Sequence, residues 1–513
     1  LWMLSLAAAR AQTVAGRVFD GNTRRPLVGV SVAATNGRGA VTDTAGSFVL
    51  NAAGGGPLRF SYVGYHPASV VLLGGEDFLL VALRRAEQTL SEVVVTGYED
   101  RRPLAEVAGP VSVVRADDIQ RFDRTSLLPA LNTLPGVRME QRAAGSYRLA
   151  IRGSQLRARF DVRNVRVYWN DVPLTNPAGN TYLNLVDPVA FGRAEVLKGP
   201  SGTLHGAGTG GAVLLYTPDD APLGTTATLR ATVGSYGLYR FGTQVQHRDD
   251  HLDLHLTHAR QHLNGYRENN ELDRDFTDLL VRYRLHDHHT LALHTWYADL
   301  EYGIPSGLTA EQAAENPRQA RPGSERQRSG LLNRTGQGAL IWTFTPHERL
   351  AWTTSAYGRT TTFENPFLFD YDRNREQSVG GRSRLAYQPL PMLRLQVGAE
   401  AQRGTEAIRT FDNRNGVAVD TALRQADDVT TQLALLFGQA DLAPWGDHLR
   451  LTAGLSVNQL RYDLLRTAGD DPGTFAQRFD PVWSPRLALV GAPTAGLTLH
   501  ASVSTGFSPP TLD

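Results

Sequence analysis

From residue 223 to its end, the chain alternates apolar and polar residues in segments of about ten. In TATLRATVGS (226–235), Ala, Leu, Ala and Val hold every second position, and Thr, Thr, Arg and Thr hold the positions between them. Because successive side chains of a strand point to opposite faces, one face is apolar and the other polar. A soluble β-sandwich also alternates, but its apolar face carries large core residues. Single rows of Leu, Ala and Val opposite Arg, Glu, Gln and His are typical of a membrane barrel, with lipid outside and water inside.

About thirteen segments follow this pattern, namely 226–234, 238–247, 252–260, 277–286, 290–299, 335–344, 350–360, 378–387, 393–403, 431–441, 449–463, 483–491 and 497–505. Short turns such as 248–250 alternate with long polar stretches such as 300–334, as in outer-membrane barrels. An ordinary bacterial barrel has an even number of strands. We therefore expect residues 219–513 to form an incomplete barrel whose last strands are absent from the chain.

The N-terminal part, residues 1–85, has a different pattern of residues. Residues 1–11, LWMLSLAAARA, are typical of the end of a secretory signal peptide, with an apolar stretch before a small-residue cleavage site. Residues 12–85 contain short alternating stretches separated by glycine and asparagine turns, which predicts a small β-sandwich. The chain has no cysteine, which excludes a disulfide scaffold, a Cys-ligated zinc site and thiol catalysis.

Two further regions link the sandwich to the alternating part. Residues 86–99, AEQTLSEVVVTGYE, contain three consecutive valines. They are either an ordinary internal strand or an exposed strand that adds to the sheet edge of a partner through main-chain hydrogen bonds. Residues 100–218 mix strands with short helices and many glycines, which predicts a compact α+β domain.

Gly206, Gly208 and Gly211 form the spacing G-x-G-x-x-G. A dinucleotide-binding turn needs a helix that begins at the last glycine. Here AVLLYTP follows, which predicts a strand, so these glycines are expected to permit tight turns and close backbone approach. The net charge of +1 also gives no broad positive field for a nucleic-acid partner.

The chain resembles the TonB-dependent outer-membrane receptors over nearly its whole length. LSEVVVTGY (90–98) is similar to the family's TonB box, and STGFSPPTLD (504–513) to a late barrel motif. Residues 12–85 resemble the carboxypeptidase-regulatory-like domain that some members carry before the box, especially in the Bacteroidetes. The plug-domain motifs occur in the family's order as LNTLPGV (131–137), IRGS (151–154) and EVLKGPSGTLHGAGTGGAVLLYTP (195–218).

This resemblance implies a mainly β fold, in which a barrel of 22 strands, C-terminally truncated here, is occluded by the α+β plug. It implies a place in the outer membrane, in contact with its lipid, and an N-terminal domain in the periplasm. The implied activity is active import of a scarce nutrient, most often a ferric siderophore or other iron complex. The ligand binds from outside, the plug shifts, and the C-terminal domain of TonB binds the box, here Glu92, Val93, Val94, Val95 and Thr96.

The family also places basic plug residues against barrel carboxylates, which form a plug lock. The matching positions here are Arg152 and Lys198, and Glu400 is the expected partner because it lies on the inward side of its strand. The alternative is that all three are solvated groups in a wet lumen. Contacts to the small-molecule ligand are expected at the plug apices, from Arg157, Arg159, Asn176 and Tyr182.

Other function classes fit less well. No catalytic residue, metal site or cofactor is predicted, and no peptidase domain follows the N-terminal domain, so the chain is not expected to be an enzyme. A passive porin-like channel or a surface adhesin is the alternative to active import. An open pore needs neither a plug nor a box, and both features therefore favour import.

Overall fold

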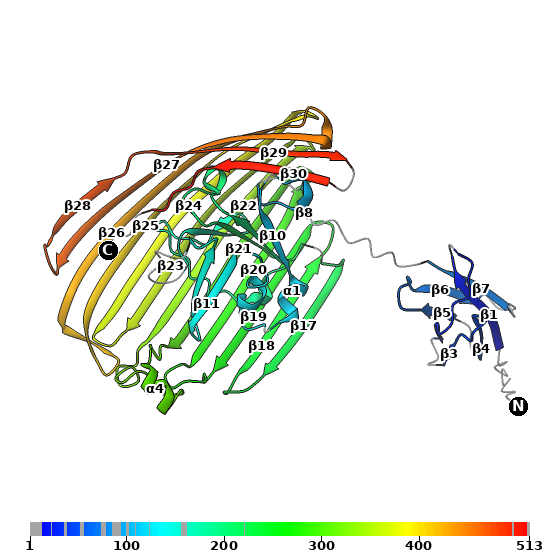
Figure 1. The fold of residues 1–513 in the computed structure, drawn as a ribbon, viewed down its shortest axis with the longest axis horizontal. Helices are drawn as coiled ribbons and strands as arrows, with labels where there is room; N and C mark the ends of the chain where they lie inside the picture. The colour runs from blue at the N-terminus through cyan, green and yellow to red at the C-terminus, as the bar shows by residue number, and fades with distance from the viewer. Residues whose placement is uncertain are drawn as a thin grey trace, which may run out of the picture. The chain divides into compact units, whose positions relative to one another are not determined.

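The computed structural model describes residues 13–21, 23–34, 38–51, 56–72, 78–84, 94–98, 102–107, 109–122, 124–154, 162–219, 221–494 and 497–509. The chain forms two compact units, Leu1–Glu92 and Val93–Asp513. The larger unit contains both the α+β domain and the long curved sheet, with the strand labels of Figure 1.

The smaller unit is the expected β-sandwich. One sheet has the order β4-β1-β7 and the other the order β3-β2-β5-β6. Alternate residues of these strands, including Val14, Phe48 and Phe60, are buried and form one apolar core. The strands are β1 (Thr13–Asp20), β2 (Ser31–Ala34), β3 (Gly39–Val41), β4 (Ser47–Asn51), β5 (Gly56–Ser61), β6 (Ala68–Leu72) and β7 (Phe78–Leu83).

The α+β domain, called the plug below, is built on a five-stranded sheet in the order β10-β15-β16-β13-β14. Its strands are short apolar runs, and all five residues of β13, VRVYW, are buried. The strands of the plug and the segment before it are β8 (Val94–Val95), β9 (Arg102–Pro103), β10 (Val111–Arg115), β11 (Val137–Ala143), β12 (Ser146–Ile151), β13 (Val165–Trp169), β14 (Val172–Pro173), β15 (Arg193–Lys198) and β16 (Gly211–Tyr216). Its helices are α1 (Ala116–Arg121), α2 (Leu128–Leu131), α3 (Gly202–His205) and the 3₁₀ turns Leu104–Glu106 and Pro188–Ala190.

The rest of the chain forms a fourteen-stranded antiparallel sheet, called the barrel wall below. Each of the thirteen segments expected from the alternation overlaps one of its strands, and the short β28 is added beside β27. The strands are β17 (Gly224–Val233), β18 (Tyr239–Arg248), β19 (Leu252–Leu263), β20 (Leu272–His286), β21 (His289–Gly303), β22 (Gly330–His347), β23 (Leu350–Pro366), β24 (Asp370–Leu390), β25 (Leu393–Arg414), β26 (Val417–Leu442), β27 (Leu449–Ala468), β28 (Gly473–Arg478), β29 (Val482–Thr494) and β30 (Leu497–Ser504). Helix α4 (Ala310–Glu315) lies between β21 and β22, and a 3₁₀ turn, Gly446–His448, precedes β27. Among the described residues, none of the helices is long and apolar enough to cross a membrane.

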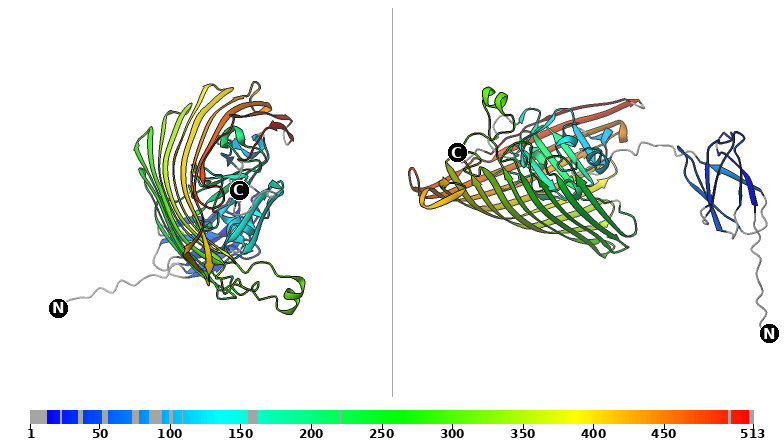
Figure 2. Two further views of the ribbon diagram at one scale, coloured as in Figure 1. Left: turned by 90° about the vertical axis from the view of Figure 1, so that its left-hand side faces the viewer. Right: turned by 90° about the horizontal axis from the view of Figure 1, so that it is seen from below.

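The barrel wall curves around the plug, which lies against its concave face (Figure 2). Along β25, Glu400 and Gln402 face the plug and are almost fully buried, whereas Val397 faces away and is 53% exposed. The apolar rows therefore face outward, as the sequence predicts. An outward aromatic cluster of His289, Trp342, Phe344 and Trp352 lies near the short turns 287–288 and 348–349, as in the interfacial girdles of membrane barrels.

One apolar cluster joins the plug to the barrel wall. Trp169 of β13 is fully buried, and its ring lies 5.0 Å from that of Phe191 in the plug and 6.3 Å from that of Phe276 in β20. Trp296 of β21 belongs to the same cluster. The plug therefore shares part of its core with β20 and β21.

The glycine-rich stretch around Gly206, Gly208 and Gly211 allows backbone segments to pack closely, as expected. Gly211 begins β16 and pairs with Lys198 of β15, so a strand and not a helix follows the last glycine of the G-x-G-x-x-G spacing. Its φ is +119°, and a Cβ atom there would lie 1.9 Å from the carbonyl oxygen of Leu197. Only glycine is compatible with both the conformation and the space.

We expect the substitution Gly211→Ala to destabilise the plug by about 2–5 kcal/mol, because backbone strain and overpacking add at this position. Hydrogen–deuterium exchange of residues 193–216 should accelerate in the full-length chain. Gly338→Ala is the matched control, since nothing lies within 4 Å of a Cβ atom at Gly338. Equal protection of β15 and β16 in both variants would contradict this account of Gly211.

Candidate functional site

The segment around the three valines is packed against the plug. Val94 and Val95 form β8, which pairs antiparallel with Pro103 and Arg102 of β9. Val95 is fully buried. Of the two alternatives for this segment, the structure therefore agrees with the internal strand and not with the exposed one, because β9 pairs with one edge of β8 and the side chain of Val95 is buried. Of the five predicted TonB-binding residues, Glu92 and Val93 lie outside the described residues.

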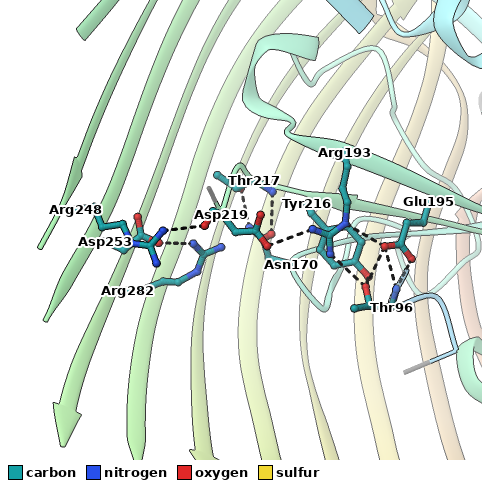
Figure 3. Close-up of polar contacts among 10 residues, drawn as sticks. All are labelled: Thr96, Asn170, Arg193, Glu195, Tyr216, Thr217, Asp219, Arg248, Asp253 and Arg282. Atoms are coloured by element: carbon teal, nitrogen blue, oxygen red, sulfur yellow. Dashed lines mark hydrogen bonds and ion pairs between the residues drawn. The ribbon is translucent and has the colours of Figure 1, made fainter. Parts of the chain in front are cut away.

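Thr96 connects this segment to the central sheet of the plug (Figure 3). Its backbone N–H donates to both carboxylate oxygens of Glu195, at 3.1 and 2.9 Å. Its hydroxyl donates to the phenolic oxygen of Tyr216 at 2.6 Å. Glu195 and Tyr216 belong to β15 and β16, so Thr96 is held by two neighbouring strands.

Glu195 is fully buried and is supported by Arg193, whose Nε donates to it at 3.1 Å. The Arg193 guanidinium also lies 4.1 Å from the centre of the Tyr216 ring and pairs with Asp219 at 3.3 Å. The backbone oxygen of Asp219 accepts a hydrogen bond from Arg248 of the barrel wall. Burial raises the pKa of Glu195 above its ordinary value, although Thr96 and Arg193 favour the charged form.

The next two residues attach the segment to the plug and the wall. The carbonyl oxygen of Gly97 lies 3.1 Å from Nε2 of His205 in α3. The ring of Tyr98 lies 3.7 Å beneath the guanidinium of Arg486 in β29. Residues 94–98, called the docked box below, thus contact β15, β16, α3 and the barrel wall.

Glu400 is the centre of a buried ionic cluster between the plug and the barrel wall. Its carboxylate accepts hydrogen bonds from Arg166 of β13 at 2.9 Å and from Arg382 of β24 at 2.7 Å. Tyr168 and Gln402 donate to the same carboxylate, at 3.0 and 2.6 Å. A buried charge is tolerated when it is paired and hydrogen-bonded in this way.

The structure corrects the predicted partners of Glu400. Lys198 instead donates to the backbone oxygen of Pro135 at 2.7 Å. The Arg152 guanidinium lies beside Gly199, within the plug. The alternation placed Glu400 on the inward face, but it carries no information on which distant arginine it meets. Arg166 could have been suspected, because an arginine inside the apolar run VRVYW needs a buried partner.

A second ionic contact was not predicted. Asp187 of the plug is fully buried and binds Arg240 of β18 at 2.6 Å and Arg274 of β20 at 3.0 Å. The same carboxylate accepts from the N–H of Val189 at the start of a 3₁₀ turn. The sequence Asp-Pro predicts that turn but not the two arginines.

Two of the predicted ligand contacts meet the barrel wall at one glutamate. The side-chain amide of Asn176 and the hydroxyl of Tyr182 donate to the two oxygens of Glu376, at 3.1 and 2.6 Å. Glu376 pairs across the sheet with Glu406, which accepts from Asn374. Arg157 and Arg159, the other two predicted contacts, lie outside the described residues.

Family models match three consecutive parts of the chain. The CarboxypepD_reg-like domain matches residues 14–95, the TonB-dependent receptor plug domain residues 103–213, and the TonB-dependent receptor-like β-barrel residues 203–513. The last of these matches covers more than half of the chain.

Individual proteins are similar over smaller parts. The vitamin B12 transporter BtuB of Vibrio vulnificus (strain CMCP6) is 29% identical over 148 residues, which are 28% of this chain and 23% of that protein. The structure of the ferric citrate transporter FecA superposes with a TM-score of 0.69 at 15% identity, covering 81% of this chain and 66% of that one. The ferric yersiniabactin uptake receptor FyuA from Yersinia pestis gives 0.65 at 16% identity, over 78% and 65%. The chain thus spans less than two thirds of each of these proteins and shares the fold of the two solved structures.

We expect Glu195→Ala to release the docked box. The substitution removes charge-assisted hydrogen bonds worth about 1.5–3 kcal/mol, which corresponds to at least a tenfold change in the equilibrium. Because the chain has no cysteine, Val95→Cys provides a single thiol that a maleimide reaches only after release. The labelling rate should rise about tenfold when Glu195→Ala is added. Glu140→Ala, at an ion-paired plug residue distant in sequence, is the control, and an equal rate in both variants would refute the role of Glu195.

The raised pKa of Glu195 also predicts a pH dependence. Glu195 stabilises the folded chain most below the ordinary pKa of a glutamate, and this contribution is lost as the pH rises through the raised value, because the folded state holds the proton more tightly than the unfolded chain. Hydrogen-exchange protection of β15 and β16, corrected for the intrinsic exchange rate, should therefore be lower at pH 8 than at pH 5. Glu195→Gln should abolish this difference. An identical pH profile in both proteins would contradict the assignment.

Proposed function

The chain belongs to the family of TonB-dependent receptors of the outer membrane, and from this premise we propose that it actively imports a scarce nutrient in the form of a ferric siderophore or other iron complex. In this proposal residues 1–11 are the end of a signal peptide and 12–85 the N-terminal domain. Residues 86–99 are the TonB box and linker, 100–218 the plug and 219–513 the barrel wall.

Energy coupling is assigned to Glu92, Val93, Val94, Val95 and Thr96, which bind TonB by strand addition. The docked box supports this assignment in one specific way. The backbone of Val94 and Val95 already forms an antiparallel ladder, with β9 as its partner. A strand of TonB could replace β9 without any change in the extended conformation of the two valines. Release of Thr96 from Glu195 would make the exchange possible.

Transport also requires the plug to move within the barrel. The contacts that hold it against β24 and β25 include the Glu400 cluster, and those against β18 and β20 include Asp187 with two arginines. Ion pairs of this kind can exchange partners while both domains stay folded. We therefore assign the plug lock to Glu400, Arg166 and Arg382.

We assign the chemical class of the transported ligand from two residues at the plug apex. In the structure, the side-chain donors of Asn176 and Tyr182 are both hydrogen-bonded to Glu376. A chelate that presents carboxylate, catecholate or hydroxamate oxygens would compete with Glu376 for both donors, because anionic oxygens are the strongest acceptors. Binding outside would then weaken one contact between the plug and the wall. FecA is a ferric citrate transporter and FyuA a ferric yersiniabactin uptake receptor, so both of these proteins act on ferric complexes.

We expect Val94→Pro to abolish energy-dependent uptake, because proline removes the backbone N–H that a strand-adding partner needs. The measurement is accumulation of ⁵⁵Fe from a panel of ferric chelates in cells with this receptor, with and without an uncoupler. Val94→Ala is the matched control. It keeps the N–H and should retain uptake.

Surface abundance and ligand binding should be equal in the two variants, so that a folding defect is recognised. Undiminished uptake in Val94→Pro cells would argue against coupling through the box. Uptake that also persists with the uncoupler would favour the alternative, a passive porin-like channel. Binding without any accumulation in the unaltered protein would favour an adhesin.

A further inference from the structure

A groove with a volume of about 690 Å³ lies on the outward face of the barrel wall, over β24 to β28. These strands are neighbours in the sheet (Figure 1). A cross-strand row, in which each residue is paired with the next, forms one side of it and consists of Val379, Arg403, Gln432, Arg461 and Arg478. The outward direction follows from Glu400 and Gln402, which alternate with Arg403 on β25 and face the plug.

The floor of the groove consists of small residues. Gly381, Ala401 and Ala434 form the adjacent cross-strand row, which ends at Gln459 of β27. Because glycine and alanine do not project far from the sheet, the arginine side chains beside them rise above the floor. The groove is thus open to the surroundings of the barrel and not to its lumen.

The groove begins where the apolar outer surface ends. Along β25 the outward residues are apolar from Leu395 to Ala401, and Arg403 follows. The eight residue steps from Leu395 to Arg403 span about 27 Å at about 3.4 Å per step. With a tilt of about 40°, this is about 21 Å along the membrane normal, close to the height of about 25 Å of a lipid-facing band.

The part of the groove around Arg403 lies toward the rim of the barrel wall that carries the long loops. The end of β25 beyond Arg403 lies on the same side as the 304–329 connection. Long loops are extracellular in barrels of this kind. Arg403 therefore lies at the boundary between the acyl chains and the headgroups of the outer leaflet, and Arg461 and Arg478 belong to the same cross-strand row.

The positive charge in the groove is only partly neutralised. Arg461 pairs with Asp463 at 2.8 Å. Within the part of the chain that the structure describes, Arg403 and Arg478 have neither an ion pair nor a side-chain hydrogen bond. On β19 to β22 the corresponding arginines are paired, Arg260 with Asp275 and Arg334 with Asp299. The groove thus carries an excess of positive charge, which these two arginines on β19 and β22 do not.

We propose that this groove binds the phosphorylated headgroup of an outer-leaflet lipid. The guanidinium groups of Arg403 and Arg478 bind phosphate oxygens through paired N–H donors, which match the geometry of a phosphate. Gln432 offers a further polar contact to a sugar or phosphate headgroup, whereas the side-chain amide of Gln459 already donates to the backbone oxygen of Phe479. The acyl chains lie along the apolar rows below Ala401 and Ala434. This inference depends on the membrane location of the chain and not on its cargo.

The test measures lipid retention by the full-length chain in detergent, by native mass spectrometry. The probes are diphosphoryl lipid A, monophosphoryl lipid A and dephosphorylated lipid A. The unaltered protein should retain the diphosphoryl form best and the dephosphorylated form least. The double variant Arg403→Gln, Arg478→Gln should bind the diphosphoryl form about tenfold more weakly, as expected for the loss of charge-assisted contacts. Arg334→Gln is the matched control, because its charge is already paired at the edge of the outer apolar surface, and it should bind as the unaltered protein does.

Three results would overturn the proposal. The first is equal retention of the phosphorylated and dephosphorylated lipids. The second is unchanged affinity in the double variant, whose folding is checked by the heat-modifiable migration of the barrel on gels. The third is displacement of the lipid by millimolar inorganic phosphate, which would make the groove a site for free phosphate.

Discussion

The polar concave face of the barrel wall is the constraint on which the rest of the structure depends. Alternating strands that turn Leu, Ala and Val toward lipid must turn their charged residues inward. Once the plug fills that space, each charge loses water and needs a partner. The plug supplies these partners, with Arg166 for Glu400 and Asp187 for Arg240 and Arg274. Plug and wall are therefore complementary in charge, and neither surface would be satisfied alone.

The plug is held differently on its two sides. Toward β20 and β21 it shares an apolar cluster built on Trp169, together with the Asp187 contacts. Toward β24 and β25 the described contacts are dominated by Glu400 and Glu376. Apolar burial is not directional and resists separation, whereas ionic contacts depend on geometry and can exchange partners. The side that faces β24 and β25 is the one better suited to rearrangement.

Much of the fold could be predicted from the sequence, because a period of two is a local property. The alternation located the thirteen segments and the inward face of Glu400, and AVLLYTP predicted the strand after Gly211. The partner of Glu400 could not be predicted, since Arg166 is 234 residues away and only the assembled fold brings the two together. The partners of Val95 and Thr96 could not be predicted for the same reason. Their extended conformation is local, but their contacts with β9 and Glu195 are tertiary.

The pairing of β8 with β9 determines how a mechanical load enters the plug. Tension applied to the chain before Val94 acts at the open end of an antiparallel pair only two residues long. Such a pair unzips, with Val94 leaving Pro103 before Val95 leaves Arg102, and unzipping needs much less force than shearing the same bonds together. The tension then reaches Thr96 and its hydrogen bonds to Glu195, on the second strand of the five-stranded sheet. A single buried carboxylate is thus the contact that would resist such tension once the β8–β9 pair has separated.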